Sequence, residues 1–343
     1  MSHKIVKKKK DWACANCGDP IRQVSGLWRG MFYESVIMNW LSNGNQPNGM
    51  LIRLQGFGTG LFGGNFHTHN SLNFPPGLDV VCYSNGSDYV RGWRYNIQQA
   101  KGGRVVMSVD CTKLLNQRHV FEDMGSRDSL LLLPHPTPSE YITLEDVILY
   151  PSKRSSHTQS VDEHFVEKVI CSDVSVDNKT IVENHASYSS NADLRSYFNT
   201  STNSKPYVCI VTYGVGVPLA RQVLTLFLFI AQEVLCKKYG YENVLVIDTP
   251  CLSKIPNKLK QLFESVKNQK AGKSDPRFQI MFADMCKEMN APLNNFAVKL
   301  QNESILQHFE WKSAAALQTY NLLGKEVSFL SRDEIVNTVL SIK

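Results

Sequence analysis

The chain has 343 residues, 43% of them hydrophobic and 20% charged, which is ordinary for a globular protein and long enough for two domains. Its formal net charge is +6, and the run from Lys7 to Lys10 alone supplies four positive charges, so the remainder is nearly balanced. No uninterrupted apolar stretch reaches the roughly 18 residues of a membrane span, and no secretion-signal pattern opens the chain. We therefore expect a protein that is neither membrane-spanning nor secreted.

The basic tail and the cysteines indicate which partners and which cellular compartment the chain is suited to. A run such as Lys7 to Lys10 is typical of a solvated chain end, and the sharper alternative is contact with an anionic partner such as RNA. The nine cysteines are an odd number and mostly scattered, which favours a reducing compartment over a disulfide framework.

The first third of the chain predicts a basic arm followed by alternating helices and strands. Residues 1–26 combine the lysine run with glycine and proline and show no apolar period, so they are predicted to be extended. After them the pattern predicts a mainly buried helix at 27–41, strands at 50–55, 77–82 and 104–109, and a helix at 87–100.

Residues from about 116 to 204 have a weaker pattern, rich in Ser, Asn, Asp and His, with short strand-like pieces at 130–133 and 142–149. A stretch this long without regular elements is typical of an interdomain connection enlarged by surface loops. We expect it to be mobile or used for binding.

From residue 206 strands and helices alternate regularly. The predicted strands are 207–213, 243–248, 278–283 and 314–320, and the predicted helices are 218–238, 256–267, 293–305 and 331–341. Strands that are near-continuous apolar runs between helices indicate a mainly parallel sheet covered on both faces. Ser331 followed by Glu334 has the spacing of a capping box at the start of the last helix.

Three segments of the chain follow one another in a recognisable order. They are "GTGLFGGNFHTHNSLNFPPGLDVV" with the "YSNGSDYVRGWRYNIQQ" and "GGRVVMSVDCTKLL" that follow it, "YVCIVTYGVGVPLARQVLTL" with "NVLVIDT", and "FLSRDEIVNTVLSI". In this order they resemble the beta subunit of thiamine-diphosphate-dependent 2-oxoacid dehydrogenases of the pyruvate or branched-chain type. The resemblance covers about 230 residues, and its pieces are strand and turn patterns rather than an invariant signature.

The resemblance implies an α/β protein with a basic cysteine-containing arm at 1–26, a truncated transketolase-like pyrimidine domain at 27–121, a loop-rich connection at 122–204 and a three-layer α/β/α transketolase C-terminal-like domain at 205–343. In the family, about 80 residues precede the helix matched by 27–41, and they carry the carboxylate that bonds the aminopyrimidine of thiamine diphosphate. Here the first glutamate is Glu34, inside that helix. The resemblance therefore implies that the cofactor half-site is missing.

His67 and His69 fall in the loop where the family places an active-site histidine, and the sequence does not decide between them. Without that context, paired histidines on a glycine-rich loop are more often surface hydrogen-bonding elements. The preceding glycines, Gly58, Gly60 and Gly63, spell G-x-G-x-x-G after a strand, but no helix can open at once behind them, so a dinucleotide site is not expected.

Cys14 and Cys17 have the spacing of a zinc knuckle. A structural zinc needs four ligands, and the chain contains no second Cys-x-x-Cys, so a partner chain or a distant residue would have to complete the site. A redox pair and plain structural cysteines remain as alternatives.

The expected function is that of a degenerate, non-catalytic paralogue of the beta subunit, without cofactor of its own, serving as a structural or assembly subunit in a mitochondrial complex. Its partners would be other protein subunits, such as an alpha-subunit-like paralogue or a second copy. One alternative is an active beta subunit that shares thiamine diphosphate with an alpha chain and performs oxidative decarboxylation of a 2-oxoacid. Another is an RNA-associated protein that uses Lys7 to Lys10.

Overall fold

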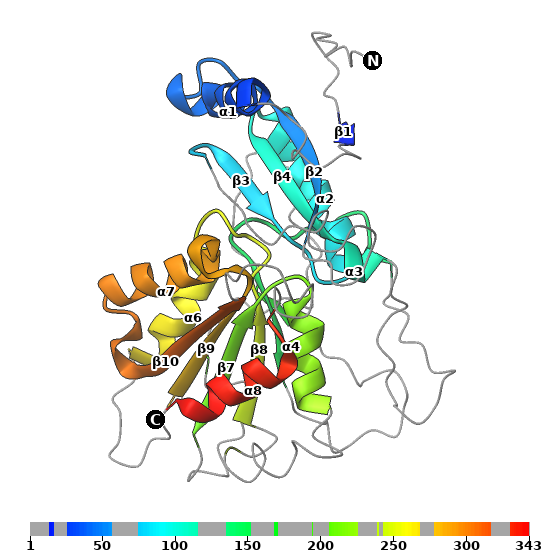
Figure 1. Ribbon diagram of the computed structural model, residues 1–343. Coiled ribbons are helices and arrows are strands. Elements are labelled where there is room, and N and C mark those ends of the chain that lie inside the picture. The colour runs from blue at the N-terminus through cyan, green and yellow to red at the C-terminus, as the bar shows by residue number, and fades with distance from the viewer. Residues whose placement is uncertain are drawn as a thin grey trace.

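A computed structural model gives the architecture of the chain (Figure 1). It describes residues 14–16, 26–56, 75–115, 135–151, 168–170, 194, 206–225, 239, 243–267, 278–316 and 330–342. These residues form an α/β protein with two separate, mainly parallel sheets, which confirms the predicted fold class. Within the described helices, none is both long and apolar enough to cross a membrane.

The first sheet is all parallel, with strand order β1-β2-β4-β3. Its strands are β1 (Cys14–Asn16), β2 (Met50–Gly56), β3 (Leu78–Val81) and β4 (Val105–Cys111). Every residue of β4 is buried, because this strand lies between β2 and β3 and is covered by α2 (Gly86–Lys101). The short helix α3 (Thr112–Leu115) follows β4 directly.

Helix α2 packs on the sheet through a stripe of residues spaced four apart. Asp88, Gly92, Asn96 and Ala100 are all buried, which is the spacing that places side chains on one face of a helix. Asn85 caps the start of the helix, because its side chain accepts a hydrogen bond from the backbone N–H of Asp88. A glycine is required within this stripe, because a Cβ at Gly92 would lie 2.0 Å from a ring atom of Tyr83.

Helix α1 (Gly26–Leu41) is present where a helix is predicted, but the prediction that it is mainly buried is wrong for its described side chains. Val36 is fully buried, whereas Met38, Trp40 and Leu41 are 41%, 54% and 61% exposed. In Figure 1, α1 lies at the end of the first sheet that is remote from the second sheet. An apolar helix sequence does not show whether its apolar side faces its own core, so the burial could not be read from residue types alone.

The second sheet has the strand order β10-β9-β7-β8-β5-β6. Its strands are β5 (Val147–Pro151), β6 (Lys168–Ile170), β7 (Tyr207–Thr212), β8 (Val244–Asp248), β9 (Phe278–Lys287) and β10 (Phe309–Ala316). The strands from β7 to β10 are mutually parallel, and β5 runs antiparallel to both β8 and β6. The expected connection at 122–204 therefore contributes strands to this sheet.

Helices cover both faces of the second sheet, giving three layers (Figure 1). They are α4 (Gly216–Thr225), α6 (Asn257–Lys267), α7 (Pro292–Asn302) and α8 (Arg332–Ser341), with short 3₁₀ turns η7 (Glu288–Asn290) and η8 (Leu306–His308). The chain moves from β7 to β8 in one direction and from β9 to β10 in the other. Right-handed crossovers then place α4 on the opposite face from α6 and α7, and α8 returns to pack against α4.

Most predicted elements of the second sheet match the structure closely, and two differ. The capping box of α8 is confirmed, with Ser331 accepting from the backbone of Glu334 and the Glu334 side chain reaching back. Strand β10 begins at Phe309, five residues before the predicted start at Ala314. Glu310 and Lys312 interrupt the apolar run at its beginning, so the residue types there do not indicate a buried strand. The predicted helix at 218–238 is described only as far as Thr225.

Candidate functional site at the junction of the two sheets

The site residues expected from the sequence fall largely outside the described residues. His67, His69, Cys17 and the run from Lys7 to Lys10 all lie there. Cys14 opens β1, where its backbone lies opposite Leu51 of β2. The catalytic histidine, the zinc pair and the RNA contact therefore stay predictions.

The second sheet has a topological switch point between β7 and β9, since the crossovers leave these two neighbouring strands in opposite directions. In open α/β sheets, ligands usually bind outside the carboxyl ends of the strands at such a point. Here that position is filled by the chain itself. Tyr213 and Asp284 lie there, both with 0% exposure, and the Tyr213 hydroxyl donates to Asp284 Oδ1 at 2.6 Å.

Asp284 is held in place by backbone donors as well as by Tyr213. Its Oδ1 accepts from the N–H of Cys286 at 2.8 Å, and its Oδ2 accepts from the N–H of Leu293, in the first turn of α7, at 2.6 Å. Burial raises the pKa of Asp284 to about 7, in opposition to these hydrogen bonds, which lower it. The carboxyl group thus joins the end of β9 to the start of α7.

The carboxyl end of the first sheet meets this region directly. The backbone N–H of Cys82, just after β3, donates to the carbonyl of Pro250 at 2.8 Å, and the N–H of Leu252 donates to the carbonyl of Val80 at 2.8 Å. Val81 and Cys251 also form an isolated antiparallel bridge. The two sheets therefore face each other with their carboxyl ends, and backbone hydrogen bonds close the junction.

Two buried thiols and a glycine pack at the centre of the junction. Cys82 Sγ and Cys111 Sγ lie 3.5 Å apart, and a Cβ on Gly214 would lie 2.6 Å and 2.7 Å from them. Gly214 also has a φ of +52°, in the left-handed region that favours glycine. Burial raises the pKa of the Cys82 thiol, and its hydrogen bond to Cys111 acts in the same direction.

Asp248, at the end of β8, is the second fully buried carboxyl group of the junction. Its Oδ2 accepts from the hydroxyl of Ser84, while Oδ1 has no hydrogen-bond partner among the described residues. Burial raises the pKa of Asp248, against the opposing effect of the hydrogen bond from Ser84. The raised pKa favours the uncharged form of this group, which suits a dry position between two sheets.

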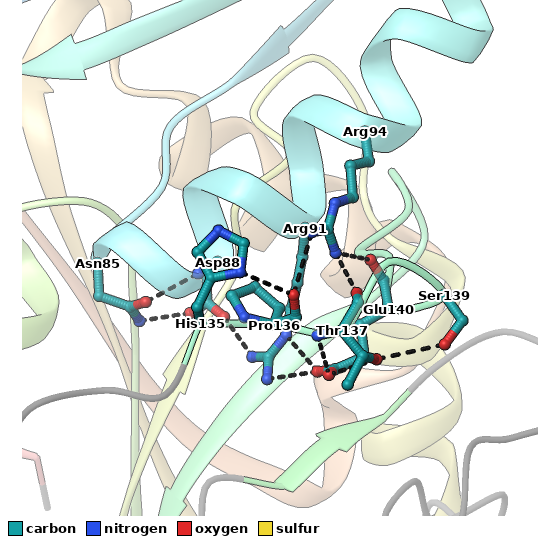
Figure 2. A network of polar contacts seen from close by, with 9 residues as sticks. All are labelled: Asn85, Asp88, Arg91, Arg94, His135, Pro136, Thr137, Ser139 and Glu140. Atoms are coloured by element: carbon teal, nitrogen blue, oxygen red, sulfur yellow. Dashed lines mark hydrogen bonds and ion pairs between the residues drawn. The ribbon is translucent and has the colours of Figure 1, made fainter.

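A strap formed by residues 135–146 runs beside the junction and is fastened to α2 (Figure 2). Arg91 Nε donates to Glu140 Oε2 at 2.9 Å, and Arg94 donates to the carbonyls of Pro136 and Thr137. Burial raises the pKa of Glu140, but the hydrogen bonds from Thr137 and Arg91 outweigh it and hold that pKa below its ordinary value. The arginine side chains are thus occupied in holding backbone and carboxylate groups of the same chain.

The buried aspartates of the described residues all accept hydrogen bonds from within the chain. Their donors are Arg104 for Asp79, Asn85 and Arg91 for Asp88, Arg53 for Asp110, Thr143 for Asp146, Ser84 for Asp248 and Tyr213 for Asp284. In the described part of the chain, no three His, Cys, Asp or Glu side chains are grouped so that they could hold a metal ion. The arrangement is suited to closing an interface.

The sequence did not reveal these residues as a cluster, because their partners are far apart in the chain. Tyr213 and Asp284 are 71 positions apart, and Ser84 and Asp248 are 164 apart. A signal was nevertheless present. Tyr213 and Asp248 lie at the carboxyl ends of β7 and β8, and Asp284 lies in the last part of β9. Ser84 follows β3 by three residues, and the carboxyl ends of parallel strands share one edge of a sheet.

Of the comparisons with known proteins, the one with solved structures finds similar chains. No family model and no curated protein matches the sequence. Among solved structures, the chain is similar to a split-gene transketolase described as an inactive beta4 tetramer, with 10% sequence identity and a TM-score of 0.45. That similarity covers 90% of this chain and 74% of the other.

Proposed function

We propose that the protein is a non-catalytic structural subunit of a larger protein assembly, related in architecture to 2-oxoacid dehydrogenase beta subunits and without thiamine chemistry of its own. The observation that carries this proposal is the filled switch point. Tyr213, Asp284 and Gly214, together with Cys82 and Cys111 of the first sheet, occupy the position at which open α/β sheets usually bind a ligand.

The carboxyl groups support the same proposal. Thiamine chemistry needs a carboxylate that bonds the cofactor ring and so sets up its base. The buried aspartates of the described residues are each engaged by a donor of the chain, and the pKa values of Asp248 and Asp284 are raised by burial. These groups therefore do not fit the role of a free, charged carboxylate that faces a cofactor.

The exposed apolar residues of α1 support a role in assembly. Met38 and Leu41 are three residues apart, so they share a side of the helix, and Trp40 lies next to them. Apolar side chains that gather on a surface mark sites of protein association more often than scattered ones do. The proposed partners are other subunits of the same assembly, and the proposed location, which follows from the family resemblance, is the mitochondrion.

The test is an assay of the full chain with a conventional alpha subunit, thiamine diphosphate, magnesium and a 2-oxoacid. The proposal predicts no cofactor-dependent release of carbon dioxide above the alpha subunit alone. The variants His67→Ala and His69→Ala are the matched controls, because they remove the histidines that an active beta subunit would use. Carbon dioxide release that either substitution abolishes would establish the active-enzyme alternative instead.

A further inference from the structure

The strap at residues 135–146 is attached to both halves of the molecule. Its first part is bound by α2, which belongs to the first sheet. Its second part is bound at the start of α6, which belongs to the second sheet. The strap therefore bridges the same two sheets whose carboxyl ends meet at the junction.

The attachment to α2 relies on two arginines (Figure 2). Arg91 pairs with Glu140, with Nη2 and Oε2 at 2.7 Å, and the two side chains are only 13% and 19% exposed. Arg94 donates from Nη2 to the carbonyl of Pro136 at 3.0 Å. Thr137 completes this end, since its N–H and its hydroxyl both donate to Glu140 Oε1, at 2.7 Å and 2.8 Å.

The attachment to α6 relies on Glu145. Its carboxylate pairs with Lys254 and accepts from the N–H of Asn257, the first residue of α6, at 2.9 Å. Its carbonyl accepts from the N–H of Lys258 at 3.2 Å. A carboxylate at this position also interacts favourably with the helix dipole. Charged groups thus fasten both ends of the strap.

From these contacts we infer that the strap is an electrostatic clamp that holds the two sheets together and keeps the junction closed. The direct contact between the sheets includes backbone hydrogen bonds around Cys82 and Leu252 and the packing of Gly214 against two thiols. It also includes hydrogen bonds that involve side chains, which are Val80–Ser253, Ser84–Asp248 and Asn85–Tyr150. The clamp adds a second, separate attachment, which restricts rotation of one sheet against the other. When the clamp is released, the junction opens and exposes Cys82 and Cys111, whatever the chain does in its assembly.

The two thiols make the opening measurable, because Cys82 and Cys111 are 0% and 3% exposed in the closed molecule. The full chain is treated with a maleimide, and the modification of individual cysteines is followed by mass spectrometry. The test variants are Arg91→Gln and Glu140→Gln.

The experiment has an internal reference and a control variant. Cys209 is the internal reference, since it is equally buried but lies within β7, between β8 and β9. Lys260→Gln is the matched control, because it breaks the Lys260–Glu303 ion pair without touching the strap.

If the strap is a clamp, modification of Cys82 and Cys111 should be accelerated by about tenfold or more in Arg91→Gln and Glu140→Gln. A tenfold change is equivalent to about 1.4 kcal/mol. Cys209 should stay unmodified in these variants, and Lys260→Gln should behave like the parent chain. Raised salt should accelerate modification in the parent chain only slightly, because the Arg91–Glu140 pair is largely buried and is screened much less than an exposed pair. Arg94→Gln, which removes the hydrogen bonds to the carbonyls of Pro136 and Thr137 and keeps that ion pair, decides the matter if the other variants do not fold. Equal acceleration at all three cysteines, or none, in the variants that fold would overturn the inference.

Discussion

At the scale of single residues, the carboxyl group of Asp284 is expected to make stability depend on pH. Its pKa is about 7 in the folded chain against 3.8 for an exposed aspartate, so between these values the folded state retains a proton that the unfolded state gives up. The free energy of unfolding should therefore fall as the pH rises from about 4 to about 7, and level off above.

The variant Asp284→Asn isolates this effect. It should lower the free energy of unfolding by about 1–3 kcal/mol, because an amide cannot accept from Tyr213, Cys286 and Leu293 together. Urea unfolding at pH 5 to 8 measures both effects. The parent chain should lose stability relative to the variant as the pH rises, and a constant difference between the two would show that Asp284 does not titrate in this range.

Gly214 allows a second test at the same scale. The change Gly214→Ala places a Cβ against two sulfur atoms at a positive φ, so it should lower the free energy of unfolding by about 1–3 kcal/mol. Adding Cys82→Ala should restore part of the loss, because it removes one of the two clashing atoms. If the two changes are strictly additive in denaturant unfolding, the described contact is not the cause.

At the scale of elements, substitutions in α1 can distinguish an effect on folding stability from an effect on the proposed association with a partner. Replacing Trp40 and Leu41 by Ser should leave the melting temperature nearly unchanged, because both side chains are more than half exposed. The same change should reduce the amount of partner subunit that co-purifies with the chain. Val36→Ala is the control, since Val36 is fully buried and its truncation should lower stability instead. Unchanged co-purification in the serine variant would remove α1 from the interface.

The elements also show how far the sequence predicts this fold. Near-continuous apolar runs predicted the bounds of β7 and β8 to within one residue. The reason is that a parallel strand covered on both faces consists mostly of apolar residues. The exposure of Trp40 could not be predicted in this way, since apolar residues on a helix suit a partner surface as well as a core. Pairs such as Ser84 and Asp248 could not be predicted either, because chain folding alone brings them together.

At the scale of the whole molecule, the two mainly parallel sheets are joined at the edge where α/β enzymes usually have their ligand sites. That edge is occupied by Tyr213, Asp284 and the packed sulfur atoms. The strap is attached to α2 on one half (Figure 2) and to α6 on the other. These contacts hold the junction closed, and the proposed role in assembly rests on that closure.

The most direct measurement is a calorimetric titration of thiamine diphosphate with magnesium into the purified full chain, together with any chain that co-purifies with it. A conventional alpha subunit is added in a second titration, so that a cofactor site shared between subunits is also covered. The proposed non-catalytic role predicts no saturable binding that depends on this chain, at cofactor concentrations up to the millimolar range, in either titration. Saturable binding at micromolar concentration that requires this chain would contradict that role.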